Sequence, residues 1–282
     1  MAMEFKRLGK TDVFVPALGL GTWEMGGRFH PDYSQDDDVV EIIRYAVERG
    51  MSLIDTAEVY GAGHCEELVG EAIKRFPREK VFIATKVWPD NLRYETVLKA
   101  LERSLERLGT SYVDLYQVHW PNPFIPVRET MKAMEKLVDE GKVRFIGVSN
   151  FSVKELDEAM SHLSKYDIVS NQVLYNPMSR LIEEELLPFC KKNKITIIAY
   201  RPLGKGSLLK EPYRSRLEKL GRKYNKTPAQ LIINWVIRHE NVIAIPKTLK
   251  KSHLDELLGS VGWKMTSEDY EKLLILLSLS CT

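Results

Sequence analysis

Short apolar segments alternate with amphipathic helical segments along nearly all 282 residues, and this alternation predicts an α/β fold, a (β/α)8 TIM barrel with a small N-terminal β-hairpin. The repeated unit is expected eight times within about 250 residues, which favours a closed barrel over an open, doubly wound sheet. The expected strands are apolar on both faces, as parallel strands covered by helices must be. No shift in composition marks a linker, so we expect residues 1–282 to form a single barrel domain.

The hairpin and the first barrel strand occupy the start of the chain. Residues 5–8 and 13–15 are expected to pair across a turn at residues 9–12. The first barrel strand follows at residues 17–20 and opens into the segment Gly21-Thr22-Trp23.

The first full unit combines a helix, a cap and a strand. One helical face consists of Val39, Ile42, Ile43, Ala46 and Val47. Gly50 ends that helix as a left-handed cap would, and the apolar strand after it delivers Asp55 to its end. Tyr60 follows five residues later, in a loop where its phenol is expected to be exposed.

The same pattern continues to the end of the chain. Further helical faces are expected within residues 68–76, 97–108, 131–138, 186–190, 231–236 and 270–277. Further strands are expected at residues 81–84, 113–118, 143–148, 168–169, 195–199 and 242–245. Ser152 with Glu155 predicts a capping box on one more helix, and Thr227 before Pro228 predicts the start of another.

Composition and charge argue against several classes of protein. The net charge is +2 and no block of lysine and arginine stands out, so no nucleic-acid partner is expected. No apolar run is long enough to span a bilayer, and the first residues lack the apolar core of a signal peptide, so we expect no membrane partner and a cytoplasmic location. Cys65, Cys190 and Cys281 lack metal-type spacing and fit a reducing interior.

Polar side chains collect where the expected strands end. They are Asp55, Lys86, His119, Ser149, Asn150, Asn171, Gln172, Tyr200, Lys247 and Thr248. The C-terminal strand ends of a barrel converge on one mouth, which is its working face. These residues are therefore expected to be neighbours in one site.

Four side chains suit proton delivery to a carbonyl group. Asp55 can pair with Lys86 and keep this lysine protonated in an apolar pocket. The ammonium is expected to lower the pKa of the Tyr60 phenol and make it a general acid. His119 can hydrogen-bond a carbonyl oxygen and orient it toward Tyr60. The set suits hydride reduction, which places negative charge on such an oxygen.

Simpler interpretations exist for some of these residues. Asp55 and Lys86 can form a purely structural ion pair. A metal-dependent barrel needs several histidine and carboxylate ligands at its strand ends, and only Asp55 and His119 qualify, so no metal is expected. Gly19-Leu-Gly21 begins a dinucleotide-fold motif, but Glu24 occupies its third glycine position.

Six segments, in order and covering almost the whole chain, resemble the aldo-keto reductases: residues 55–60, 85–88, 118–121, 147–150, 199–204 and 245–248. The scarcity of glutamine beside many charged residues adds a hint of a thermophilic source, so the chain resembles a short, thermophilic member. The resemblance implies a barrel that uses NADP(H) or NAD(H) to reduce aldehydes and ketones to alcohols reversibly. On the matching positions it implies Tyr60 as proton donor, Lys86 tuning it, Asp55 paired with Lys86, and His119 orienting the substrate.

The resemblance also implies which residues bind the cofactor. Residues 149–150 and Gln172 would hold the carboxamide, and Tyr200 would stack on the nicotinamide ring. Residues 203–205 would lie along the pyrophosphate, and residues 247–248 would meet the 2′-phosphate. The full set is Gly21, Thr22, Trp23, Asp55, Ser149, Asn150, Gln172, Tyr200, Arg201, Leu203, Gly204, Lys205, Lys247, Thr248, His253 and Glu256.

Two positions depart from the family pattern. His253 stands where many members have an arginine over the adenine and the 2′-phosphate, and Leu257 stands where an asparagine usually follows Glu256. A neutral histidine cannot replace a bidentate guanidinium on a phosphate. We therefore expect NADP(H) to be bound with weakened discrimination and NAD(H) to be accepted as well.

The substrate site is expected to be open and permissive, because the chain ends at Thr282, soon after its last helical face. Longer members use a C-terminal loop to shape this site. Trp23, Trp88 and Trp120 are expected to line it. A small-molecule carbonyl or alcohol is the expected partner of a monomer or weak homo-oligomer. Two other functions stay open: a regulatory subunit that senses nicotinamide cofactor, and a promiscuous detoxifying enzyme without a dedicated substrate.

Overall fold

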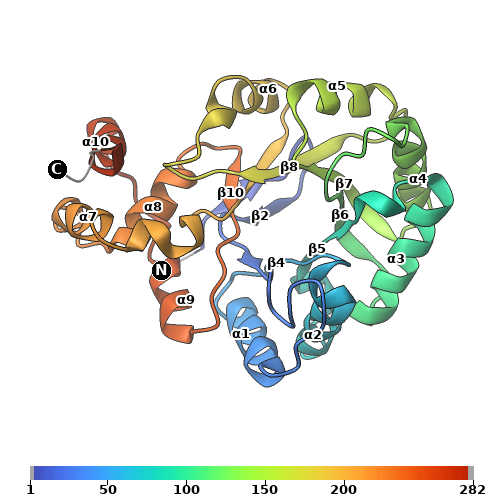
Figure 1. The fold of residues 1–282 in the computed structure, drawn as a ribbon, viewed down its shortest axis with the longest axis horizontal. Coiled ribbons are helices and arrows are strands. Elements are labelled where there is room, and N and C mark those ends of the chain that lie inside the picture. Colours follow the sequence, from blue (N-terminus) through green and yellow to red (C-terminus); the bar gives the residue numbers. More distant parts are fainter. Residues whose placement is uncertain (1–2, 279–282) are drawn as a thin grey trace.

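The computed structural model describes residues 3–278, and the predicted barrel of eight parallel strands is confirmed in this part of the chain. Cys281 lies outside the described residues. Strands pair with their neighbours in sequence order, with the helices around them (Figure 1). The barrel strands are β3 (Leu20–Gly21), β4 (Leu53–Asp55), β5 (Phe82–Val87), β6 (Val113–Val118), β7 (Val143–Ser149), β8 (Ile168–Leu174), β9 (Thr196–Tyr200) and β10 (Val242–Ala244).

The barrel closes between its first and last strands. Leu18 pairs in parallel with Ala244, and the backbone N–H of Gly19 donates to the carbonyl of Ala244 (2.9 Å). The first strand itself is shorter and later than the predicted residues 17–20, because the residues before Leu20 pair with β10 instead. A Cβ at Gly21 would lie 2.7 Å from the carbonyl oxygen of Ile245, so the closing seam requires a glycine there.

Helices cover the outside of the barrel (Figure 1). The predicted capping box is present, with Ser152 accepting from the N–H of Glu155. The predicted cap at Thr227 is also present, and Thr227 forms a further capping box by accepting from the N–H of Gln230. The α-helices are α1 (Asp36–Glu48), α2 (His64–Ile73), α3 (Tyr94–Leu108), α4 (Val127–Asp139), α5 (Val153–Ser161), α6 (Leu186–Lys192), α7 (Tyr213–Gly221), α8 (Pro228–Val236), α9 (Lys251–Leu258) and α10 (Ser267–Ser278). The 3-10 helices are η1 (Tyr60–Gly63), η2 (Arg78–Lys80), η3 (Pro89–Asn91), η4 (Leu181–Glu183) and η5 (Gly204–Leu209).

The predicted N-terminal hairpin is formed by β1 (Phe5–Arg7) and β2 (Phe14–Pro16), which pair antiparallel. Leu8 and Val15 of this hairpin are buried in one apolar cluster with strand residues such as Leu53 and Ile243. The hairpin therefore fills one end of the barrel and leaves the other end for the site.

Lys6 ties this hairpin to the last part of the barrel. Its ammonium is buried and donates to the carbonyls of Ile237, His239 (2.8 Å) and Val242 (2.9 Å). Ile237 and His239 follow α8, and Val242 begins β10. One lysine thus satisfies several backbone acceptors at once.

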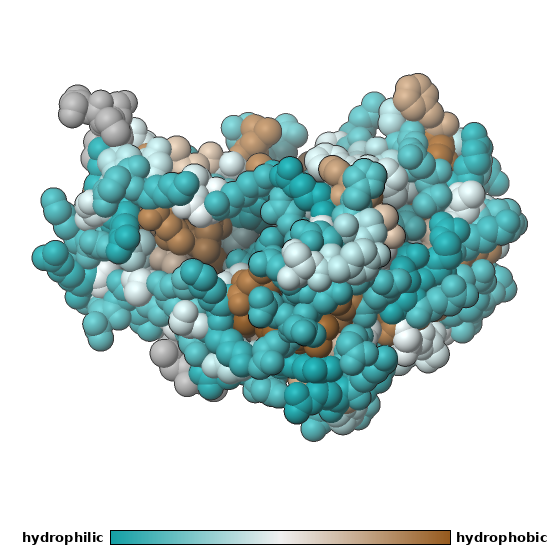
Figure 2. Space-filling view, turned by 60° about the horizontal axis from the view of Figure 1, so that its bottom comes forward, coloured by the Kyte–Doolittle hydropathy of each residue, from teal (hydrophilic) through white to brown (hydrophobic). Residues whose placement is uncertain are grey.

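The face shown in Figure 2 is mostly hydrophilic, and apolar residues gather on it in separate patches. Among the helices of residues 3–278, none has the length and apolar character needed to cross a bilayer.

Replacing Lys6 with methionine is expected to lower the free energy of unfolding by about 1–3 kcal/mol, because buried carbonyls lose a charged donor. Urea unfolding measures this. Lys10→Met is the matched control on the same hairpin, since Lys10 makes an exposed ion pair with Asp167 (2.6 Å) that is worth at most about 1 kcal/mol. Equal effects of the two substitutions would show that the hydrogen bonds of Lys6 add no stability beyond that of an exposed ion pair.

Candidate active site

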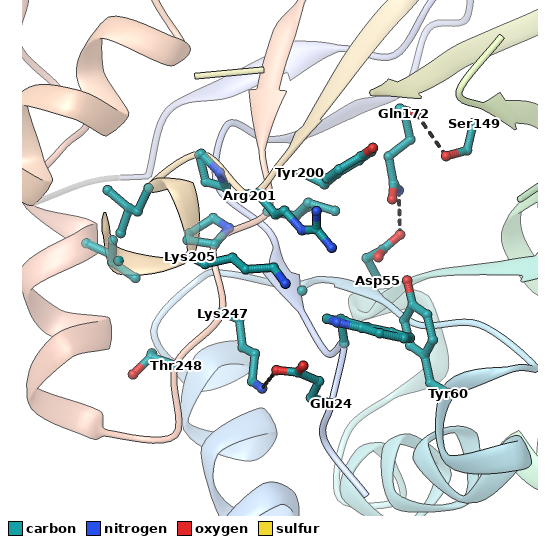
Figure 3. A pocket seen from close by; sticks show the side chains of 18 of the residues that line it. Glu24, Asp55, Tyr60, Ser149, Gln172, Tyr200, Arg201, Lys205, Lys247 and Thr248 are labelled. Atoms are coloured by element: carbon teal, nitrogen blue, oxygen red, sulfur yellow. Dashed lines mark hydrogen bonds and ion pairs between the residues drawn. The ribbon is translucent and has the colours of Figure 1, made fainter. Parts of the chain in front are cut away.

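A pocket of about 700 Å³ opens at the C-terminal ends of the barrel strands. Figure 3 shows side chains from β4, β7, β8 and β9, and from the segment after β10, around one space. Most of the predicted site residues line this pocket: Gly21, Trp23, Asp55, Tyr60, Trp88, His119, Trp120, Ser149, Asn150, Gln172, Tyr200, Arg201, Leu203, Lys205, Lys247, Thr248, His253 and Glu256.

Lys86 lies behind the pocket wall and is fully buried. Its ammonium donates to Asp55 Oδ2 (2.8 Å), to the carbonyl of Thr56 (2.8 Å) and to Tyr60 Oη (3.2 Å). Strand register brings the charges together, because Asp55 at the end of β4 pairs with Ala84, two residues before Lys86 on β5. The expected ion pair is therefore present, and each buried charge has the partners that burial demands.

Tyr60 begins η1 and is buried, with 6% of its surface exposed, rather than standing in an open loop as expected. Its ring meets those of Trp23 and His119 edge to face, with centroids 4.8 Å and 5.7 Å away. The following turn requires glycine: Gly61 has a φ of 56°, and a Cβ there would lie 2.2 Å from the carbonyl oxygen of Gly26. This close approach holds Tyr60 against the pocket.

Burial raises the pKa of Tyr60 well above the usual range of a phenol, and the charge of Asp55 raises it further. The expectation of a lowered pKa was wrong, because burial removes water from the phenolate and disfavours it. Tyr60 therefore keeps its proton at neutral pH, as a proton donor must.

His119 follows β6 and is a neutral imidazole at any working pH. Burial and the charge of Lys86 lower its pKa to about 2. Its Nδ1 is buried and has no hydrogen-bond partner among the described residues. Its ring also meets Trp88 edge to face, with centroids 5.2 Å apart. A neutral imidazole can donate one hydrogen bond to an oxygen beside Tyr60 without adding charge next to Lys86.

Ser149, Asn150, Gln172 and Tyr200 form one hydrogen-bonded group. Tyr200 Oη donates to Asn150 Oδ1 (2.9 Å), and Asn150 Nδ2 donates to Ser149 Oγ (3.0 Å). Ser149 Oγ donates to the carbonyl of Gln172 (2.9 Å), and Gln172 Nε2 donates to Asp55 Oδ1 (2.7 Å) (Figure 3). Gln172 thereby links this group to the buried ion pair, a connection that the sequence did not reveal.

The other side of the pocket carries cations. Lys205 and Lys247 lie there (Figure 3), and exposed His253 also lines the pocket. Arg201 lies instead beside Tyr200, with its guanidinium carbon 5.8 Å from the centroid of that ring. Lys247 Nζ lies 3.5 Å from Glu24 Oε2. Glu24 entered the sequence argument only as the break in a glycine motif, so its place in the pocket was missed.

Two further residues at the site were missed as well. Glu58 Oε1 accepts from the N–H of Trp88 (2.7 Å) and from Asn91 Nδ2 (3.0 Å), which holds the Trp88 segment to the loop before Tyr60. Phe29 lines the pocket and meets the Trp23 ring, with centroids 5.5 Å apart. Glu58 lies within the family-like segment of residues 55–60 but was given no role, and no motif marks Phe29, which tertiary folding brings to the site.

Four of the predicted residues lie outside the pocket wall in the described chain: Thr22, Lys86, Asn171 and Gly204. Asn171 Nδ2 donates instead to the carbonyl of Phe151 (2.9 Å). Thr22 is buried, and its Oγ1 donates to the carbonyl of Asp55 (2.8 Å). Within residues 3–278, no three histidine, cysteine, aspartate or glutamate side chains gather in a way that could hold a metal ion.

The donors around the pocket fit a nicotinamide dinucleotide. Amide side chains and the Tyr200 ring lie near Asp55, while Lys205 and Lys247 lie on the far side, where phosphates would find charged donors (Figure 3). Trp23 Nε1 is buried and has no hydrogen-bond partner within the part of the chain that the structure describes. Such an unused donor in the wall of a pocket is suited to a ligand.

The chain matches known proteins over nearly its full length. A model of the Aldo/keto reductase family matches residues 17–277. Methylglyoxal reductase YeaE of Escherichia coli (strain K12) is 40% identical over 92% of this chain and 89% of that protein. The structure of the thermostable aldo-keto reductase Tm1743 with the inhibitor epalrestat has a TM-score of 0.93 and 47% identity, covering 97% of this chain and 100% of that one. An aldo/keto reductase from Klebsiella pneumoniae in complex with NADP and acetate has a TM-score of 0.87 and 37% identity, covering 98% and 95%.

The buried neutral His119 is expected to make the protein lose stability in acid. The unfolded histidine takes up a proton below pH 6.5, whereas the folded one does so only near pH 2. The wild-type protein therefore loses about 1.4 kcal/mol of unfolding free energy per pH unit below 6.5 from this residue. His119→Asn removes this loss, so between pH 6.5 and 4.5 the wild type should lose about 2–3 kcal/mol more than the variant.

Urea unfolding at several pH values measures the difference. His162→Asn, at an exposed position at the end of α5, is the matched control and should follow the wild type. The same pH dependence in His119→Asn and wild type would contradict a neutral, buried His119.

Proposed function

The chain belongs to the aldo/keto reductase family, and from this premise we propose that it reduces aldehydes and ketones to alcohols with NADPH, reversibly, with Tyr60 as the proton donor. One observation carries the proposal: the Tyr60 hydroxyl lies 3.2 Å from the buried ammonium of Lys86, in the wall of the pocket. A phenol with a fixed cation beside it can release a proton and keep the resulting charge stabilised.

A reduced nicotinamide, when bound in this pocket, would supply a hydride to the carbonyl carbon. As negative charge builds on the carbonyl oxygen, Tyr60 donates its proton to that oxygen, and the alcohol is complete. Lys86 stabilises the phenolate that is left, and Asp55 holds Lys86 in place. His119 donates a hydrogen bond to the same oxygen and directs it toward Tyr60. In the oxidative direction the phenolate takes the proton back.

The raised pKa of Tyr60 is compatible with this role. Tyr60 must be protonated when the substrate arrives, and a raised pKa ensures this at neutral pH. The oxygen that receives the proton becomes an alkoxide, which is a stronger base than a phenolate. Transfer of the proton from Tyr60 to this alkoxide is therefore thermodynamically favourable. Lys86 favours the transfer further by stabilising the phenolate that remains.

We assign the cofactor residues by the chemistry of their side chains. Asn150 and Gln172 would hold the carboxamide beside the Tyr200 ring, and Arg201 with Lys205 would meet the pyrophosphate. Lys247 with Thr248 would meet the 2′-phosphate, with Glu256 at the adenine. Trp23, Trp88 and Trp120 would surround the substrate. We also propose that NADH is accepted, since His253 lacks the bidentate guanidinium that an arginine would offer the phosphate.

The physiological substrate class is a small carbonyl compound in this proposal. The similarity to methylglyoxal reductase YeaE makes small aldehydes the first compounds to test. We infer a cytoplasmic location because Cys65 and Cys190 are free, buried thiols, which suits a reducing compartment. We further propose that the enzyme acts as a monomer or weak homo-oligomer.

Tyr60→Phe is expected to lower kcat by about 10²–10⁴-fold, because the proton donor is lost, while NADPH still binds. Loss of reduced-nicotinamide absorbance with a panel of small aldehydes measures turnover, and fluorescence titration measures cofactor binding. Tyr45→Phe is the matched control, since Tyr45 hydrogen-bonds Asp255 at an exposed position (2.8 Å), and it should keep the full rate.

A full reductase rate in Tyr60→Phe would overturn the role of Tyr60 in catalysis. Tight NADPH binding by the wild type without turnover of any aldehyde would instead favour a cofactor-sensing regulatory subunit.

His253→Arg is expected to tighten NADPH binding several-fold, because an arginine adds a charged donor for the 2′-phosphate. NADH binding should change little. The two dissociation constants are compared by fluorescence titration, with His162→Arg as a control of the same charge change away from the pocket. Equal gains for both cofactors would contradict a phosphate site at His253.

A further inference from the structure

Glu24 lies between two cations from different parts of the chain. Its Oε1 accepts from Arg28 Nε (2.7 Å), and its Oε2 lies 3.5 Å from Lys247 Nζ. Arg28 belongs to the same loop as Glu24, whereas Lys247 follows β10 on a different wall of the pocket (Figure 3). The carboxylate therefore reaches from the loop after β3 to the wall that holds Lys247.

The two pairings differ in strength and in position. The contact with Arg28 has the length of a charge-assisted hydrogen bond, and the contact with Lys247 is longer. Glu24 and Lys247 both line the pocket, with 36% and 33% of their side chains exposed. Lys247 can therefore exchange its partner for a ligand while Glu24 stays paired with Arg28.

The backbone keeps Glu24 at this place. Glu24 has a φ of 69°, a conformation that is uncommon for residues other than glycine, and it forms an antiparallel bridge with Gly27. Burial alone would raise the pKa of Glu24, but the hydrogen bonds from Arg28 and Lys247 lower it overall. A charged carboxylate is thus presented to Lys247 by a defined turn, not by a freely moving chain.

We propose that Glu24 is a specificity-determining residue that competes with the 2′-phosphate of NADPH for Lys247. The inference rests on the proposed function, in which Lys247 meets that phosphate. A phosphate that binds Lys247 must displace the carboxylate and then remain near its negative charge. NADH carries no phosphate at this position, so its binding requires neither displacement of the carboxylate nor repulsion between two negative charges. Glu24 therefore weakens NADPH binding selectively and brings the affinities of the two cofactors closer together.

The first test compares the dissociation constants of NADPH and NADH for wild type and Glu24→Gln. The amide keeps the shape of the side chain and removes its charge. NADPH binding should tighten by about 2- to 5-fold, the range for a partly exposed ion pair, and NADH binding should stay the same. Equal changes for both cofactors, or weaker NADPH binding, would overturn the proposal.

A double-mutant cycle with Lys247→Gln separates this inference from the function it rests on. Lys247→Gln alone should weaken NADPH selectively; if it does not, the phosphate role of Lys247 fails, and with it the premise. If it does, Glu24→Gln added to Lys247→Gln should give no further gain. A gain of the same size in that background would show that Glu24 acts without Lys247 and would overturn the proposal.

Two more variants test whether the position of Glu24, and not net charge, sets the cofactor preference. Arg28→Gln leaves Lys247 as the remaining ionic partner of Glu24 in this contact, so NADPH binding should weaken while NADH binding is unchanged, the opposite sign to Glu24→Gln. Asp139→Asn removes a negative charge from an exposed pair with Lys165 on α4 (2.8 Å) and should change neither constant. Selective tightening of NADPH by Asp139→Asn would show that net charge, not the position of Glu24, sets the preference.

Discussion

The site depends on a lysine whose charge lies completely inside the protein. A buried ammonium is tolerated only where its partners are complete, and Lys86 has a carboxylate, a backbone carbonyl and a phenol around it. The other oxygen of Asp55 is held by Gln172 from the far side of the barrel. Breaking such a pair by removing one partner costs about 3–5 kcal/mol. The geometry that places Tyr60 next to a cation is therefore also part of what holds this end of the barrel together.

Strand register gives this arrangement its precision. Lys86 pairs with Gln117 on the next strand, and Ser149 pairs with Gln172 across β7 and β8. A shift of one residue in any of these strands would turn the polar side chain to the opposite face. The hairpin at the other end fills the barrel with apolar side chains, so the polar groups are confined to the mouth. Packing at one end thus makes a dry, fixed polar site possible at the other.

The sequence was sufficient for the fold and for most residues around the pocket, because apolar periodicity and strand-end polarity are local signals. It was insufficient for properties that depend on tertiary surroundings. The pKa of Tyr60 moved opposite to expectation because neighbouring rings and loops exclude water from it. Glu24 belongs to none of the family-like segments, and Glu58 lies in one without a local signal for its contacts. Helix α9 was missed because its apolar face is short, with Leu254 and Leu257 buried. Local patterns indicate which groups approach one another but not how much water remains between them.

The two lysine–carboxylate pairs at the pocket differ in solvent exposure, and this difference decides whether each pair is permanent or exchangeable. The pair of Lys86 with Asp55 is excluded from solvent, so neither charge can leave without a large loss, and the pair stays fixed through a reaction cycle. The pair of Lys247 with Glu24 is about one-third exposed on each side and longer, so water compensates most of its loss. A fixed pair suits proton transfer, which needs one geometry, whereas an exchangeable pair suits a charged ligand that must enter and leave. The same two side-chain types, lysine and a carboxylic acid, therefore serve opposite needs within one pocket because they are buried to different degrees.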